Sequence, residues 1–102
     1  MRVAVLVSGT GSILDALLAE DVPVSLVLAD RRCPALERAE RSGVPAVLVA
    51  RDRFDAGFDR EAYSGRVAEV LDAHDIYVVA MAGFGTILGR AAHDRYAGRI
   101  IN

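Results

Sequence analysis

The feature that most constrains the fold is a regular alternation of short apolar runs and helix-period segments along the 102-residue chain. The apolar runs are rich in Val, Ala and Leu, which is typical of parallel strands covered on both faces. Strands that alternate with helices form a parallel sheet with right-handed crossovers. We therefore expect an α/β fold, a three-layer open parallel sheet of the Rossmann-like doubly wound type with strand order 3-2-1-4-5. Strands are expected at 2–7, 23–30, 45–50, 76–83 and 99–102, and helices at 12–20, 34–43, 59–73 and 89–98.

Length and composition predict one domain, residues 1–102, built around one core. Hydrophobic residues make up 53% of the chain, and the formal net charge is −2 with no block of like charge. This pattern lacks the basic surface of a nucleic-acid-binding protein, and no apolar stretch is long enough to span a membrane. The single cysteine, Cys33, allows no internal disulfide and no metal-ligand spacing, although its own role stays open. We expect a cytoplasmic protein without a metal, a nucleic-acid partner or membrane association.

The turn after the first strand is the first candidate site, because ligands of doubly wound sheets bind at the carboxyl ends of the strands. Its sequence is "SGTGS", residues 8–12. Gly9 and Gly11 let the backbone take positive φ and approach a ligand closely. The amides of Gly11, Ser12 and Ile13 then point from the helix N-terminus towards an anion. We predict that the turn binds a single phosphate group.

Two other interpretations of this turn stay open. A dinucleotide fingerprint needs a small residue where Leu14 stands, although Asp30, which ends the second strand, is the acidic residue such a fingerprint requires. Alternatively, the glycines only form a tight turn. In each case the following helix is expected to bury one face, formed by Ile13, Leu14, Leu17 and Leu18.

Four motifs in order resemble the N-terminal half of the phosphoribosylglycinamide formyltransferase family. They are "VLVSGTGS" (5–12), "DREAY" (59–63), "AGFGTIL" (82–88) and "YAGRIIN" (96–102). The resemblance implies an enzyme of purine biosynthesis with a Rossmann-like N-terminal domain that binds the nucleotide substrate. Such an enzyme transfers the formyl group of 10-formyltetrahydrofolate to the amine of a small-molecule substrate, glycinamide ribonucleotide.

The resemblance also assigns roles to individual residues. Substrate phosphate binding falls on Gly11, Ser12, Ile13 and Arg60, and the catalytic asparagine on Asn102, whose carboxamide donates a hydrogen bond to the formyl oxygen. Gly85 and Thr86 stand where the family has Met and Arg, which leaves open whether folate binding is preserved. The folate pocket is implied at Met81, Gly85, Thr86, Ile87, Leu88 and Ile100.

In the family, the catalytic histidine and aspartate follow the segment that matches Asn102. His74 and His93 lie outside that histidine motif and are expected at the surface or at helix caps. We therefore expect this chain to be a fragment that binds the phosphate and is inactive alone, with dimerisation through its unpaired sheet edge. The alternatives are a dinucleotide-binding or non-catalytic Rossmann module, and a fragment of formyltetrahydrofolate deformylase.

Overall fold

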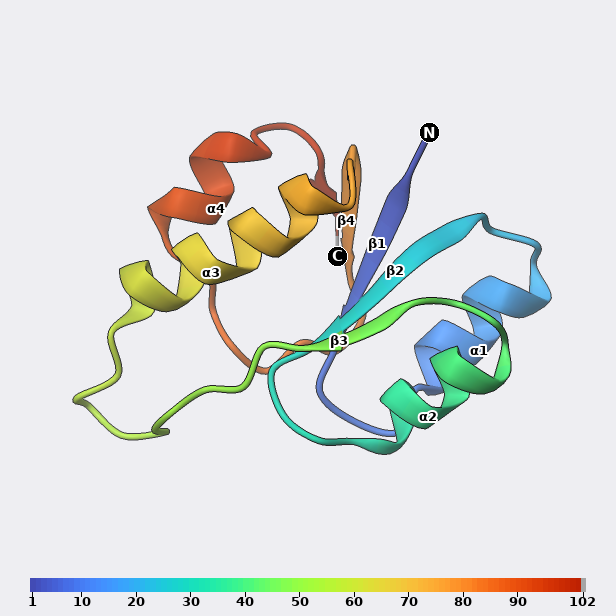
Figure 1. Cartoon of the computed structure of the whole chain (residues 1–102), viewed down its shortest axis with the longest axis horizontal. Coiled ribbons are helices and arrows are strands. Elements are labelled where there is room, and N and C mark those ends of the chain that lie inside the picture. The colour runs from blue at the N-terminus through green and yellow to red at the C-terminus, as the bar shows by residue number, and fades with distance from the viewer. Residues whose placement is uncertain (102) are drawn as a thin grey trace.

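Strands and helices alternate throughout residues 1–101, the part of the chain that the computed structural model describes (Figure 1). The strands form one parallel sheet in the order β3-β2-β1-β4-β5, so the predicted fold class and strand order are confirmed. The strands are β1 (Val3–Val7), β2 (Val24–Ala29), β3 (Ala46–Leu48), β4 (Val78–Met81) and β5 (Ile100–Ile101). The helices are α1 (Ser12–Ala19), α2 (Pro34–Arg41), α3 (Arg60–Ala73) and α4 (Arg90–Arg95).

Helices cover both faces of the sheet, with α1 and α2 on one side and α3 and α4 on the other (Figure 1). Successive side chains of a strand point to opposite faces, so β1 contributes to both layers of the core. Ala4 and Leu6 pack in the layer that contains Tyr63 of α3. Val5 and Val7 pack with the residues of α1 and α2. The central strand is therefore buried on both sides, as its continuous apolar sequence predicts.

Local signals in the sequence set most of the helix boundaries. The Asp59 side chain caps α3 by accepting a hydrogen bond from the Ala62 amide at 3.0 Å. Gly43 follows α2 with a φ of +76°, which glycine adopts without strain. The fourth strand is shorter than expected, because the Ile76 amide bonds back to the Leu71 carbonyl at 3.0 Å and so belongs to the turn that closes α3.

The expected buried face of α1 is wrong at its first turn. Leu14 is fully buried, and Leu17 and Leu18 pack beside it, but the Ile13 side chain is 51% exposed. Ile13 lines a surface pocket together with the preceding glycine turn instead of packing on the sheet. The helix therefore anchors its glycine turn through Leu14 and leaves the neighbouring position free at the surface.

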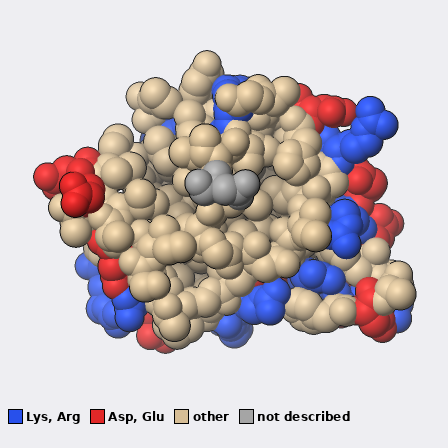
Figure 2. Space-filling view, turned by 180° about the vertical axis from the view of Figure 1, so that it is seen from behind, with Lys and Arg blue, Asp and Glu red and all other residues tan. Residues whose placement is uncertain are grey.

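The surface carries no block of a single charge on the face turned away from the viewer of Figure 1. Figure 2 shows that face, where acidic and basic side chains lie mostly around the rim and uncharged side chains fill the centre. No helix within residues 1–101 is both long and apolar enough to cross a bilayer.

Candidate functional site

The glycine turn between β1 and α1 leaves main-chain donors free at the carboxyl edge of the sheet. Gly11 is the N-cap of α1 with a φ of +87°, and no side chain caps the helix. The first hydrogen bond of the helix runs from the Asp15 amide to the Gly11 carbonyl at 2.8 Å. The amides of Ser12 and Ile13 precede that bond and have no acceptor within residues 1–101. Amides in this position, at the positive end of the helix dipole, suit an anion.

These donors face a small pocket of about 180 Å³. Ala82 and Gly83, which follow β4, form its other wall. Pockets for drug-sized ligands commonly measure about 300–1,000 Å³, so this one suits a phosphate group better than a dinucleotide. The pocket thus brings together the residues predicted to bind phosphate, Gly11, Ser12 and Ile13.

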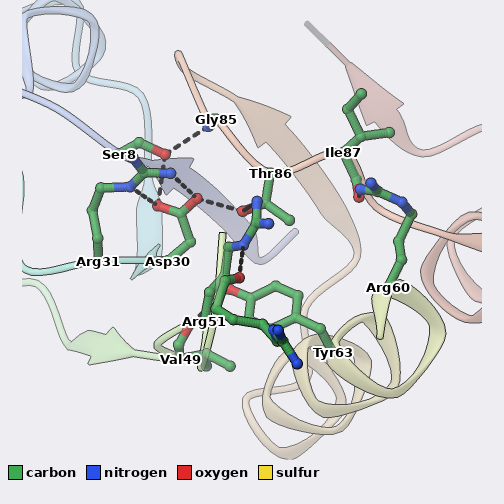
Figure 3. A network of polar contacts seen from close by, with 11 residues as sticks. Ser8, Asp30, Arg31, Val49, Arg51, Arg60, Tyr63, Gly85, Thr86 and Ile87 are labelled. Carbon is green, nitrogen blue, oxygen red and sulfur yellow. Dashed lines mark hydrogen bonds and ion pairs between the residues drawn. The ribbon is translucent and has the colours of Figure 1, made fainter. Parts of the chain in front are cut away.

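A buried carboxylate lies beside this pocket, at the end of β2 (Figure 3). Asp30 is fully buried, and Ser8 donates a hydrogen bond to its Oδ1 at 2.7 Å. Arg31 donates to both carboxylate oxygens at 3.0 Å, and the Thr86 hydroxyl donates to Oδ2 at 2.5 Å. Burial by itself raises the pKa of Asp30, but the hydrogen bonds from Arg31, Thr86 and Ser8 outweigh it and hold this pKa below its ordinary value.

In this environment the Asp30 carboxylate cannot bind a ribose hydroxyl, as a dinucleotide site would require. An acidic residue after the second strand of such a site must offer its carboxylate to a ribose hydroxyl. Here Ser8, Arg31 and Thr86 occupy both oxygens of Asp30, and the side chain has no exposed surface. Leu14 fills the position where the fingerprint needs a small residue. The geometry therefore argues against the dinucleotide interpretation.

The segment after β4 is held from several sides (Figure 3). The Gly85 amide donates to the Ser8 hydroxyl at 2.6 Å, and Arg60 of α3 donates to the Ile87 carbonyl at 2.5 Å. At the start of α4, the Gly89 amide donates to the Ser64 hydroxyl at 2.7 Å. These bonds fix the backbone of this segment relative to β1 and α3.

The residues expected at a folate pocket divide into two groups. In the first group, Thr86 and Leu88 are buried, and Met81 and Ile100 pack against the core layer beneath α3 and α4. The side chains of this group therefore contact other parts of the protein. Ile87 is 71% exposed, and Gly85 is also exposed. The structure thus brings these residues to one region, but only Ile87 offers an exposed apolar side chain there.

Arg60 and the other residues named from the sequence lie in different places. The Arg60 guanidinium donates to the Ile87 carbonyl and lies 5.5 Å from the centroid of the Phe58 ring. Arg60 does not line the pocket of the glycine turn. Its predicted role in phosphate binding stays a prediction. Asn102, the predicted catalytic asparagine, lies outside the described residues. His74 caps α3 and His93 is exposed on α4, as expected.

Sequence reasoning missed the side chains that organise this edge of the sheet. The Arg51 guanidinium lies over the Phe54 and Phe58 rings, 4.5 and 3.8 Å from their centroids, and donates to the Thr86 hydroxyl at 3.3 Å. The buried Tyr63 hydroxyl donates to the Val49 carbonyl at 2.6 Å, which ties α3 to the end of β3. The only sequence signal was the clustering of polar residues immediately after apolar strands.

No group of three or more potential metal ligands occurs within residues 1–101. The candidate site is therefore built from main-chain amides, hydroxyl groups, one buried carboxylate and arginines.

The chain is similar to phosphoribosylglycinamide formyltransferases from several bacteria. A phosphoribosylglycinamide formyltransferase from Mycobacterium tuberculosis (strain ATCC 25618 / H37Rv) is 37% identical over 106 residues, covering 99% of this chain and 48% of that protein. One from Escherichia coli (strain K12) is 34% identical over 109 residues, covering 100% of this chain and 50% of that protein. The crystal structure of phosphoribosylglycinamide formyltransferase from Streptococcus pneumoniae TIGR4 matches with a TM-score of 0.85 and 34% identity, covering 97% of this chain and 53% of that chain.

The chain spans about half the length of these three proteins. The family model described as "Formyl transferase" matches it from residue 1 to residue 102. The match covers the glycine turn and the segment after β4, which form the candidate site. On this match the chain belongs to the formyl transferase family.

Proposed function

We propose that the chain forms the nucleotide-binding part of a phosphoribosylglycinamide formyltransferase of purine biosynthesis in the cytoplasm. The complete reaction transfers a formyl group from 10-formyltetrahydrofolate to the amine of glycinamide ribonucleotide. The proposal is supported by relatives that carry this name and by the family match. The observation that carries it is that the amides of Ser12 and Ile13 have no acceptor within residues 1–101 and that both residues line a pocket of about 180 Å³.

The substrate phosphate binds in this pocket by accepting hydrogen bonds from main-chain groups. The amides of Gly11, Ser12 and Ile13 are the donors, and the Ser12 hydroxyl adds another. Such binding uses backbone atoms, so it tolerates the exposed Ile13 side chain. The rest of the substrate then extends across Ala82 and Gly83, towards the segment after β4.

The formyl donor binds along that segment. The amides of Thr86 and Leu88 have no acceptor within residues 1–101, and we assign them to the polar edge of a pterin ring. The Ile87 carbonyl already accepts from Arg60, and the Thr86 hydroxyl is bonded to Asp30. Recognition by this segment therefore uses its amides and the exposed Ile87 side chain.

In the reaction, the substrate amine attacks the formyl carbon and a new carbon–nitrogen bond forms. The bond between that carbon and N10 of the folate breaks, and the proton lost by the amine balances the proton that N10 gains. We assign to Asn102 the hydrogen bond to the formyl oxygen as negative charge develops there. Neither His74, bonded to the Val70 carbonyl at 2.9 Å, nor the exposed His93 lines the pocket, so neither is assigned the proton transfer.

Titration of the ¹⁵N-labelled chain followed by NMR tests the proposal. Glycinamide ribonucleotide should shift the amide signals of residues 11–13 saturably, whereas the same riboside without its phosphate should leave them unchanged. NAD is titrated separately as the competing ligand class. Saturable binding of NAD in the absence of any effect of glycinamide ribonucleotide on residues 11–13 would contradict the proposal.

A further inference from the structure

The Asp30 carboxylate contacts two loops that are far apart in the sequence. Ser8 belongs to the loop after β1, directly before the glycine turn, and Thr86 belongs to the segment after β4 (Figure 3). Their hydroxyl groups donate to different oxygens of Asp30, at 2.7 and 2.5 Å. Asp30 itself lines no part of the pocket between these loops.

The carboxylate also fixes the direction of the hydrogen bonds around it. An ionised carboxylate only accepts hydrogen bonds. The hydroxyl groups of Ser8 and Thr86 must therefore each donate their single proton to Asp30. The lone pairs of Ser8 are then left to accept from the Gly85 amide at 2.6 Å. Those of Thr86 accept from Arg51 at 3.3 Å. One buried charge thereby orders the loops that follow β1, β3 and β4.

Arg31 makes this burial tolerable. A carboxylate buried without a partner would take up a proton instead of staying charged. Arg31 pairs with both oxygens of Asp30 at 3.0 Å, and its guanidinium lies 4.8 Å from the Phe54 ring centroid. The charge of Asp30 is therefore compensated inside the network, and its oxygens stay available to the two hydroxyl groups.

We propose that Asp30 is a positioning residue, which sets the glycine turn against the segment after β4 through Ser8 and Thr86. The pocket lies between Gly11–Ile13 and Ala82–Gly83, so its width depends on this link. The inference rests on the proposed function only in taking phosphate as the ligand of the pocket. The link between the two loops through Asp30 does not depend on any ligand and is measured separately.

Amide hydrogen exchange of Gly85 measures the link directly, without any ligand. Thr86→Val removes the hydroxyl with little change in shape, and Asp30→Asn removes the charge. Loss of a charge-assisted hydrogen bond should speed exchange of the Gly85 amide about tenfold in either variant. Thr86→Ser keeps a hydroxyl at this position and should restore slow exchange.

A matched control separates positioning from general destabilisation. Asp72 is a partly buried carboxylate that, like Asp30, has a hydroxyl partner, Tyr96 at 2.7 Å, and an arginine partner, Arg95. It lies on α3 and lines a different pocket, away from the glycine turn. Asp72→Asn should lower the stability of the protein while leaving Gly85 exchange, corrected for global unfolding, as in the wild type.

Titration with inorganic phosphate then tests the consequence for the pocket. Thr86→Val should weaken phosphate binding at the amides of residues 11–13 about 3- to 30-fold, and Thr86→Ser should bind as the wild type does. Unchanged Gly85 exchange in folded Thr86→Val would overturn the positioning role, as would equal effects of Asp72→Asn. If the wild-type chain binds no phosphate, the proposed function fails, while the exchange result still decides the link.

Discussion

Substitution of Gly11 by alanine tests how the glycine turn is built. The residue has a φ of +87°, and an added Cβ would lie 3.0 Å from both Cα and Cβ of Ala35 and 3.1 Å from Cδ of Arg38. The left-handed backbone costs alanine about 1–2 kcal/mol, and forcing a methyl group against a packed helix costs about 1–3 kcal/mol more. At the low end, about 2 kcal/mol, the Tm of a domain of this size falls by about 8–16 °C.

Two other glycines serve as internal controls, because they separate the two costs. Gly43 has a φ of +76° but nothing within 4 Å of an added Cβ, so Gly43→Ala should lose only the backbone part, about 1 kcal/mol. Gly9 lies in the same turn as Gly11, also with open space around it, and Gly9→Ala should change stability by less than about 0.5 kcal/mol. Urea unfolding followed by circular dichroism measures all three. A Gly11→Ala variant as stable as Gly43→Ala would refute the close approach of the turn to α2.

Three further predictions address other parts of the molecule. Gly65→Ala should stabilise the protein by about 0.5–1 kcal/mol in urea unfolding, because Gly65 lies inside α3 with nothing within 4 Å of an added Cβ; an unchanged or lower midpoint would contradict this. The lowered pKa of Asp30 stabilises the fold above the unfolded value of about 3.9, and this contribution is lost as pH falls through the folded pKa. The unfolding free energy of the wild type should therefore fall more steeply below about pH 4 than that of Asp30→Asn, by at most about 1.4 kcal/mol per pH unit, and equal slopes would exclude this role. Ile101 on the outermost strand β5 is 56% exposed, so light scattering should show concentration-dependent association that Ile101→Lys suppresses; a wild-type chain that stays monomeric at all concentrations would count against edge pairing.

The fold followed from the sequence because its signals are local and repeated. Apolar runs, the Asp59 cap and the glycine after α2 each act within a few residues, and together they predict the alternation of strands and helices. The glycine turn between β1 and α1 was equally predictable, since Gly9 and Gly11 mark it in the sequence and Gly11 takes the expected positive φ. Its role in phosphate binding stays a prediction. Ile13 was misplaced because helical periodicity assigns a face to a residue but does not show where the helix extends past its packing partner.

The polar network could not be predicted in the same way, because its members come from the ends of different strands. Asp30 could be seen as an acidic residue ending a strand, and that observation favoured a ribose-binding role. Only the three-dimensional arrangement shows that Ser8 and Thr86, which lie 22 and 56 residues away in sequence, occupy its oxygens. A local motif does not show which distant side chains will form hydrogen bonds with a buried carboxylate.

The network includes Gly85 and Thr86, the two positions where this chain departs from the family pattern that it resembles. An added Cβ at Gly85 would lie 3.1 Å from Nη2 of Arg31 and 3.4 Å from the Ser8 hydroxyl, so a side chain at this position would be in tight contact with the Arg31 guanidinium that compensates Asp30. Thr86 supplies a short hydroxyl donor to the same carboxylate at 2.5 Å, where a longer basic side chain would compete with Arg31. Gly85, Thr86 and Asp30 therefore form one consistent set. In this chain the loop after β4 is anchored to the buried Asp30 carboxylate, which Thr86 contacts directly and which Gly85 reaches through the Ser8 hydroxyl.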